Sequence, residues 1–527
     1  MKLKWAVAIL GLSLIASMAG AQVSGPTQAE LNNSAMARDS WLMYNKSYTG
    51  TRYATLTQIN TTNVGQLQRV CTFATNDLGA FQDTPIVYKG VAYITQEDKT
   101  YAIDATNCNK LWEYDYQPSG PEVLSTNRDV AIYNGMLFRG TGDAHLLALD
   151  AATGKLLWNV QVQDSSNGYF TSSAPIVWNN MIFMGDAGAD WGIKGQMHAF
   201  NVSDGSKVWD FNVIPTGSEA GADTWGSADS TATGGGSMWT SYTLNVATGK
   251  LYISIGNPAP DFASAYRPGA NLYTDSVIVL DAKTGKLDHY YQQISGDNKD
   301  FDTSAAPIIY TLNGNLMMSV ATKQGYLFTY DDSTKQQLYK VETTSHLNMD
   351  KPPTTEGTRI CPNYTGGSQW SGPAYSPTTQ MLYVNSIDYC GVVKLGEVRL
   401  VKGQLFFGGS MELDDVSKAK GYTTAYDAAT GKQIWRFEPG ARSPGGVTVT
   451  AGGLVLTSDT AGNMYALNAK TGAVLFKTNI DNAPSGGGIS TYEVNGKQYM
   501  AIAVGNSSKG ATGVGAVAAR LAIFALP

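Results

Sequence analysis

Two short loops gather aspartates that could bind a cation or accept a proton. GDNKDFD, residues 296–302, contains Asp300 and Asp302, and GADWGIKG, residues 188–195, contains Asp190. Carboxylate oxygens are the ligands that hard cations prefer, and a positioned carboxylate can also act as a general base. A metal site or a proton-transfer site is therefore one interpretation. A hydrated acidic loop with no chemistry is the alternative.

A glycine-rich stretch between these loops offers an aromatic face and an amide oxygen. TATGGGSMWTS contains Trp239, and GNPAPD, which begins at Gly256, contains Asn257. A flat indole ring suits a planar cofactor, and an amide oxygen suits a hard cation. The alternative is a tryptophan in the core and an asparagine in a turn.

The elements that must position these residues follow from an internal repeat. The clearest copies are ALDAATGKLLW, which ends at Trp158, and AYDAATGKQIW, which ends at Trp435. In each copy an apolar strand leads to Asp or Asn, Thr-Gly makes a turn, and the next strand contains an aromatic residue, which describes a β-hairpin. Degenerate copies end at Trp112, Trp209, His289, Tyr339 and Phe476.

The repeat predicts an all-β fold, an eight-bladed β-propeller, formed by residues 22–527 as one domain. Most copies follow a second pair of short apolar segments, such as TPIVYKGVAYITQ, so each unit is a four-stranded sheet of about 40 to 50 residues. The interval from Asp331 to Asp427 is twice as long as the ordinary spacing between copies, and it contains a further hairpin, AYSPTTQMLYVNSI. The seven copies and this hairpin together predict eight blades. The segment GKQYMAIAVGN is expected to close the ring with the N-terminal segment.

The N-terminal sequence indicates the compartment of the protein, and the net charge limits its possible partners. Residues 1–21 combine two lysines, an apolar run and a final Ala-Gly-Ala, which predicts a secretory signal peptide and a periplasmic protein. No later stretch is long and apolar enough to span a membrane. A formal net charge of -6 argues against nucleic acid as a partner.

Four cysteines remain, and an oxidising compartment favours two disulfides. We predict the pairs Cys71 with Cys108 and Cys361 with Cys390. The sequence has no C-x-x-C-H motif, so a covalently attached c-type haem is not expected.

The opening segment WLMYNKSYTGTRYATLTQINTTNVGQL resembles the entry segment of quinoprotein alcohol dehydrogenases of the methanol dehydrogenase type, which use pyrroloquinoline quinone (PQQ). The resemblance extends from about Trp41 to Asn506. It implies that Trp239 is the floor on which the quinone stacks. It also implies that Asp190, Asn257 and Asp300 hold one metal ion, with Asp190 in place of the family's glutamate.

The resemblance makes Asp300 the general base. Asp302 stands at the offset where lanthanide-using relatives carry an additional aspartate and some calcium-type relatives also have an acidic residue. It is therefore a fourth implied ligand, and the ion is calcium or a lanthanide. PQQ carries three carboxylates, and Arg128 and Lys323 match cationic residues of the cofactor site, although a lone Arg or Lys is usually a surface charge. Further contacts to PQQ are implied for four polar residues: Gln82, Ser172, Ser237 and Gln369.

Two positions depart from the family pattern. Relatives cover one quinone face with adjacent cysteines, where this chain has Glu122 and Val123, and they often carry a tryptophan where it has Pro444. The cover of the quinone must therefore be built differently.

The resemblance implies a periplasmic dehydrogenase that oxidises an alcohol to an aldehyde or ketone. Since no haem motif is present, electrons are expected to leave for a separate acceptor such as a periplasmic cytochrome c. Two alternatives stay open: a non-catalytic propeller scaffold, and a quinoprotein that acts on sugars or polymeric alcohols.

Overall fold

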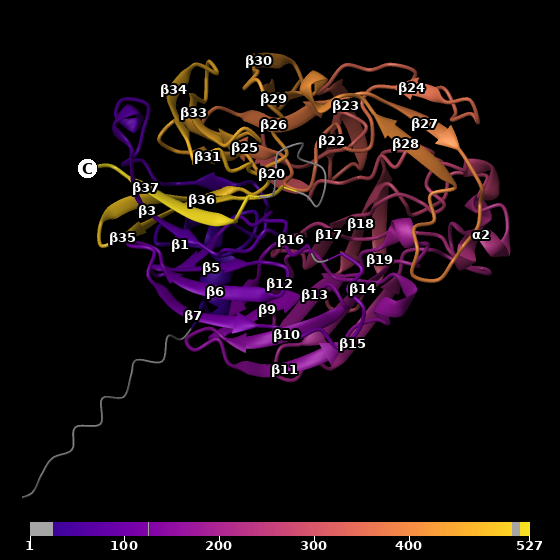
Figure 1. Ribbon diagram of the computed structural model, residues 1–527, viewed down its shortest axis with the longest axis horizontal. Helices are drawn as coiled ribbons and strands as arrows, with labels where there is room; N and C mark the ends of the chain where they lie inside the picture. The colour runs from indigo at the N-terminus through magenta and orange to yellow at the C-terminus, as the bar shows by residue number, and fades with distance from the viewer. Residues whose placement is uncertain (1–24, 125, 508–516) are drawn as a thin grey trace, which may run out of the picture.

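The computed structural model describes residues 25–124, 126–507 and 517–527, so the predicted signal peptide lies outside the described residues. The fold is all-β, as predicted, and Figure 1 shows its sheets arranged around the middle of the molecule. The described chain contains two short α-helices, α1 (Gln28–Asn32) and α2 (Ala228–Ala232). Among the described residues, no helix is long and apolar enough to cross a membrane.

Five sheets follow one another along the chain from the N-terminal side. They are β1 (Ser40–Trp41) with β4 (Ile86–Tyr88), β5 (Val91–Thr95), β6 (Lys99–Asp104) and β7 (Lys110–Asp115); β8 (Ala131–Tyr133), β9 (Met136–Gly140), β10 (His145–Asp150) and β11 (Leu156–Gln161); β12 (Ile176–Trp178), β13 (Met181–Gly185), β14 (Gln196–Asn201) and β15 (Lys207–Asn212); β16 (Thr243–Asn245), β17 (Lys250–Ser254), β18 (Ser276–Asp281) and β19 (Leu287–Gln292); β20 (Ile308–Leu312), β21 (Asn315–Ala321), β22 (Tyr326–Asp331) and β23 (Gln336–Glu342).

Three further sheets of four or five strands complete the set. They are β25 (Ala374–Ser376), β26 (Met381–Asp388), β29 (Lys420–Asp427) and β30 (Gln433–Phe437); β2 (Tyr53–Ala54), β31 (Thr448–Thr450), β32 (Leu454–Ser458), β33 (Asn463–Asn468) and β34 (Val474–Asn479); β3 (Gln68–Ala74), β37 (Arg520–Ala525), β36 (Lys497–Val504) and β35 (Ile489–Val494). The predicted extra hairpin is the pair β25 and β26.

The repeated motif joins neighbouring sheets as well as forming a hairpin within each. The Trp158 indole in β11 donates a hydrogen bond of 3.1 Å to the Val202 carbonyl of the following sheet. A Cβ on Gly205 would lie 2.8 Å from the Trp158 ring, and Gly205 has a φ of +70°. Glycine is therefore needed in this turn both for its conformation and for room. Trp112, Trp209 and Trp435 donate in the same way to Ala151, Ala282 and Ala469.

One joint between sheets is polar. His289 occupies the aromatic position of the repeat in β19, and Asp332 occupies the alanine position of the next copy. The Asp332 carboxylate accepts hydrogen bonds of 2.7 Å from the hydroxyls of Tyr252 and Tyr291. Hydrogen bonding replaces the packed indole here and still satisfies the buried groups.

The last sheet contains strands from both ends of the described chain. β3 pairs with β37, and the register places Gln68 opposite Ala525 and Phe73 opposite Leu521. GKQYMAIAVGN forms β36, which lies inside this sheet between β35 and β37. The expected closure with the N-terminal segment is therefore made by β37, the strand after the predicted one. The Tyr492 hydroxyl of β35 donates 2.7 Å to the Ala105 carbonyl of the first sheet.

A ninth sheet lies outside this series and was not predicted. It contains β24 (Thr358–Ile360), β27 (Gly391–Leu395) and β28 (Gly409–Leu413), inserted between β23 and β29. A disulfide joins Cys361 to Cys390 beside it, and another joins Cys71 to Cys108, so both predicted pairs are confirmed.

Candidate cofactor and metal site

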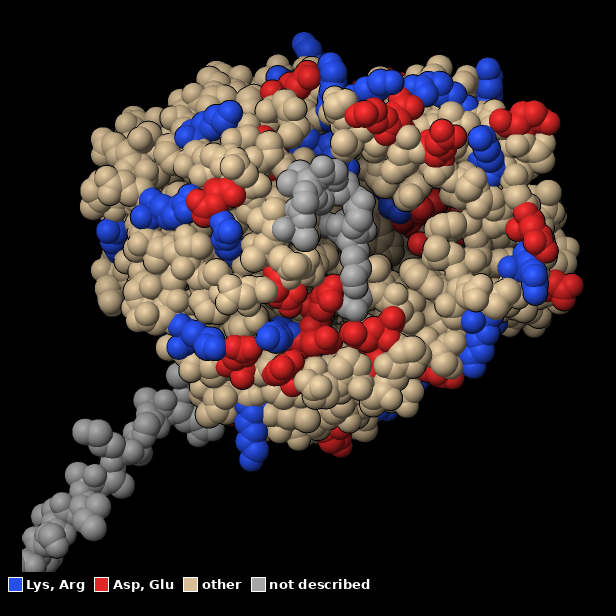
Figure 2. All heavy atoms as spheres, viewed as in Figure 1, with Lys and Arg blue, Asp and Glu red and all other residues tan. Residues whose placement is uncertain are grey.

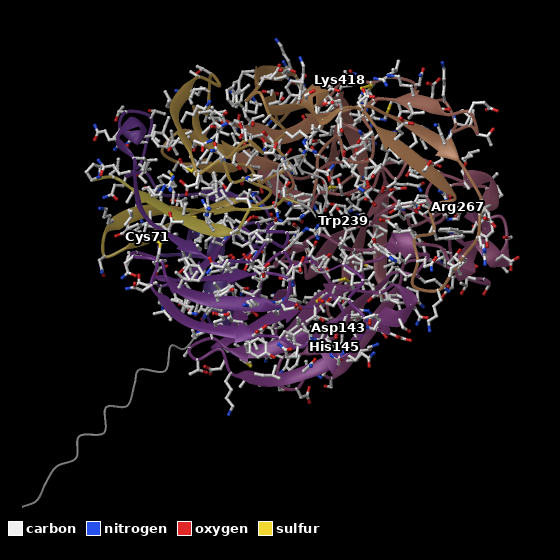
Figure 3. All side chains as sticks on the ribbon, viewed as in Figure 1. Cys71, Asp143, His145, Trp239, Arg267 and Lys418 are labelled. Atoms are coloured by element: carbon white, nitrogen blue, oxygen red, sulfur yellow. A yellow bond between two sulfur atoms is a disulfide. The ribbon has the colours of Figure 1, made fainter. Side chains whose placement is uncertain are left out.

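A cavity of about 240 Å³ gathers residues from loops of several sheets. All seven residues predicted to contact the cofactor line it, and so do three of the four predicted metal ligands. The face drawn in Figure 2 is hollowed near its middle, and Figure 3 places Trp239 near the middle of the same view. The lining residues with predicted roles are Gln82, Arg128, Ser172, Asp190, Ser237, Trp239, Asp300, Asp302, Lys323 and Gln369.

The fourth predicted ligand, Asn257, is buried directly beside the cavity. Its backbone N–H donates a hydrogen bond of 2.7 Å to Oδ1 of Asp302. A Cβ on the preceding Gly256 would lie 2.5 Å from the same oxygen. The glycine therefore allows the Asp302 carboxylate to approach the Asn257 loop closely.

The loop between β19 and β20 aims two carboxylates at one ammonium group. Asp300 and Asp302 have φ values of +58° and +28°, a backbone region that is rare for residues other than glycine and frequent at functional sites. The Lys323 ammonium lies 2.9 Å from Oδ1 of Asp300 and also contacts Oδ2 of Asp302. Within the described chain, no three His, Cys, Asp or Glu side chains are gathered tightly enough to enclose an ion as they stand.

Burial and the charges of neighbouring carboxylates raise the pKa values of Asp300 and Asp190. Burial raises the pKa of Asp300 well above its usual value, while the Lys323 charge opposes that rise. Burial also raises the pKa of Asp190, part of whose surface faces the cavity, to about 6. Although burial lowers the pKa of Lys323, the charges of the three aspartates outweigh it and raise that pKa above its usual value. Carboxylates with raised pKa values can accept a proton, and they are candidates for functional roles.

Cations and aromatic rings form the other side of the cavity. The Arg128 guanidinium lies 4.9 Å from the ring centre of Trp239 and 5.4 Å from that of Trp370. Its Nη1 donates 3.0 Å to Ser172 Oγ and 2.8 Å to the Trp239 carbonyl. Burial lowers the Arg128 pKa to about 10, which keeps it charged at neutral pH. An aromatic platform flanked by Arg128 and Lys323 suits a planar anion.

Unused hydrogen-bonding atoms support the same interpretation. In the described part of the chain, Arg128 Nε and Gln82 Oε1 are buried without a hydrogen-bond partner. Gln82 Nε2 donates 2.6 Å to the Ser507 carbonyl, and Gln369 Nε2 donates 2.7 Å to the Gly366 carbonyl. Buried polar atoms are usually paired, and these two belong to residues that line the cavity, so a polar group of a cofactor could pair with them.

The structure also shows lining residues that the sequence did not suggest. Leu124 and Thr126 line the cavity. Glu122 and Val123, which stand where relatives carry two adjacent cysteines, do not line it. Trp370 also lines it, and its position directly after Gln369 in GGSQW was an available signal. Pro444 lines a smaller neighbouring cavity of about 70 Å³. Four further aromatic residues line the cavity: Phe170, Trp191, Tyr364 and Phe407.

Comparisons with known proteins identify the family of the chain. The family model described as glucose/ethanol/alcohol dehydrogenase, beta-propeller domain matches residues 41–348 and 340–404. A second model, described as outer membrane protein assembly factor BamB, matches residues 419–514.

Three proteins that are similar to this chain are named as alcohol or methanol dehydrogenases. The chain is 29% identical to quinoprotein alcohol dehydrogenase PedH of Pseudomonas putida, over 86% of this chain and 84% of that one. It is 28% identical to the lanthanide-dependent methanol dehydrogenase of Methylacidiphilum fumariolicum, over 88% and 84%. A solved europium-containing methanol dehydrogenase superposes with a TM-score of 0.85 at 25% identity, over 94% of this chain and all of that one. The chain therefore belongs to the PQQ family of glucose, ethanol and alcohol dehydrogenase β-propeller domains.

Proposed function

We propose that this protein is a PQQ- and metal-dependent dehydrogenase that oxidises an alcohol to an aldehyde or ketone. The observation that carries the proposal is the convergence, in one cavity, of an aromatic platform, two cations and three carboxylates. Similar proteins named as alcohol and methanol dehydrogenases support the same reaction class.

Each group of residues has a separate task. Trp239 would support the flat face of PQQ, and Arg128 and Lys323 would neutralise its carboxylates, with Gln82, Ser172, Ser237 and Gln369 as polar contacts. Asp190, Asn257, Asp300 and Asp302 would hold one calcium or lanthanide ion. When bound, PQQ would supply the two-electron acceptor and the ion a Lewis acid.

Asp300 would remove the hydroxyl proton of the alcohol. Its carboxylate is buried and lines the cavity, and burial raises its pKa. The Lys323 ammonium at 2.9 Å holds it in place and limits how far that pKa rises.

The same proposal covers the architecture and the compartment. The eight sheets of four or five strands, with a hydrogen bond from Tyr492 of the last to Ala105 of the first, would be the eight blades of a single domain over residues 22–527. The N-terminal signal sequence would direct the protein to the periplasm, where a soluble cytochrome c would accept its electrons.

A non-catalytic scaffold is the alternative, since a BamB-type model matches residues 419–514. That match includes none of the residues that line the cavity. A scaffold would also have no need for Trp239, Arg128, Lys323 and the aspartates to converge. The dehydrogenase is therefore the better interpretation.

Dye reduction by purified protein, reconstituted with PQQ and either calcium or lanthanum, tests the proposal. Activity that requires PQQ is expected. Asp300→Ala should abolish turnover while PQQ stays bound, whereas Asp204→Ala, in an exposed turn, should leave turnover unchanged. Failure of the wild type to bind PQQ would favour the scaffold, and full activity in Asp300→Ala would remove that residue from the mechanism.

A further inference from the structure

An exposed loop of the inserted sheet reaches across to the cavity. Residues 396–408 connect β27 to β28, and the Gly396 N–H donates 3.0 Å to the Gly408 carbonyl at the base of this loop. In Figure 1 the segment hangs in orange below β28, toward the magenta part of the chain. We call it the 396–408 loop.

The end of the 396–408 loop is fixed to two of the three segments that carry predicted metal ligands. The Phe406 N–H donates 2.6 Å to the carbonyl of Asp190. The Phe407 carbonyl accepts 2.9 Å from the N–H of Phe262, in the loop that follows Asn257. Phe406 is only 2% exposed. The loop is therefore a built part of the site.

Aromatic rings from three segments form an apolar wall of the cavity. Phe407 lines it together with Phe170 and Trp191. The rings of Phe170 and Trp191 meet edge to face with centres 5.8 Å apart, and Phe407 packs on Phe262 at 5.6 Å. These rings offer no charge and few hydrogen-bonding atoms.

The apolar character continues onto the outside of the 396–408 loop. Val398, Leu400 and Leu405 are 38%, 49% and 50% exposed. Leu400 packs beside Gly192, the residue after Trp191, because a Cβ added to Gly192 would lie 2.9 Å from Cδ1 of Leu400. An apolar rim next to an apolar wall is typical of a binding site for an apolar group.

We propose that the 396–408 loop makes this site select alcohols whose carbinol carbon carries a large apolar or aromatic group, with Phe407 as the residue that determines specificity. The inference rests on the proposed dehydrogenase function. A sugar or polyol would leave hydroxyl groups unpaired against Phe170, Trp191 and Phe407, which is costly. Methanol would leave the wall without a partner.

The test compares kcat/KM of the PQQ- and metal-loaded enzyme for methanol, hexan-1-ol, benzyl alcohol and glycerol. We expect the wild type to prefer hexan-1-ol and benzyl alcohol at least about tenfold over methanol and glycerol. Phe407→Ala should remove at least about tenfold of that preference, mainly through KM, and Phe407→Leu should retain part of it. The absorbance of bound PQQ should be the same in all three proteins.

Phe437→Ala is the matched control, since Phe437 packs on Tyr465 at 5.0 Å, on a strand that does not line the cavity. It should keep the wild-type preference. Equal kcat/KM for glycerol and benzyl alcohol in the wild type, or an unchanged preference in both Phe407 variants, would overturn the selectivity proposal while leaving the dehydrogenase intact. Bound PQQ with no alcohol oxidised would instead refute the proposed function.

Discussion

Lys323 provides the sharpest test of the electrostatics in the cavity. Its side chain is 10% exposed, and those of Asp300 and Asp302 are 5% and 2% exposed. Removing one partner of a buried ion pair costs roughly 3 to 5 kcal/mol. With ~2.1 cal/mol/K of unfolding entropy per residue, a chain of 527 residues has about 1.1 kcal/mol/K. Lys323→Met in the metal-free protein should therefore lower Tm by about 3 to 5 °C.

Adding calcium or lanthanum should then raise Tm more in Lys323→Met than in the wild type, because the ion replaces the missing ammonium charge. The loss of Tm should also shrink at pH 5, since aspartates with raised pKa values take up protons there. Scanning calorimetry at pH 5 and pH 7.5 measures both. Lys110→Met, which breaks an exposed pair with Glu113, should shift Tm by less than about 1 °C. An unchanged Tm in Lys323→Met, with metal shifts equal to the wild type, would refute the argument.

Four more results are expected. Trp239→Ala should weaken PQQ binding at least about tenfold in fluorescence titrations, since the ring is the platform; unchanged affinity would contradict that role. Asp302→Ala should reduce lanthanum affinity in calorimetric titrations more than calcium affinity, because a third carboxylate favours a trivalent ion; equal losses would count against it. Replacing Cys71 and Cys108 by serine should cost about 4 kcal/mol in thermal unfolding for a loop of 37 residues, and an unchanged Tm would contradict the loop-entropy argument. Burial lowers the pKa of His198, but two aspartates outweigh burial and raise that pKa to about 9. The stability that His198 contributes is therefore present below about pH 6.5 and lost as pH rises through 9. His198→Asn should remove this pH dependence of the unfolding free energy in urea titrations, and a pH dependence equal to the wild type would exclude His198 as its source.

Local sequence patterns predicted the features that depend on neighbours in the chain. The hairpin in each repeat is set by Asp or Asn, Thr and Gly within a few residues, and TPIVYKGVAYITQ forms β4 and β5 as expected. The resemblance also identified the segments of the predicted site residues, and ten of these eleven residues line one cavity.

The parts that were missed depend on contacts between distant segments. Phe407 lies about 150 residues beyond Asn257, in an insertion without a repeat motif, and only folding brings it to the cavity. Arg128 could be assigned to the cofactor site, but its position over both Trp239 and Trp370 arises from three different loops. Sequence spacing carries no information about such placements.

The pairing of β3 with β37 has a consequence for the order of events during synthesis. About 450 residues separate the two strands, so the last sheet cannot be completed until nearly all of the described chain is present in the compartment where it folds. Until then β3 and β36 each present an unpaired edge, to which another chain could add. Variants that slow the arrival of β37 should therefore aggregate while they are being made, even when the finished protein is as stable as the wild type.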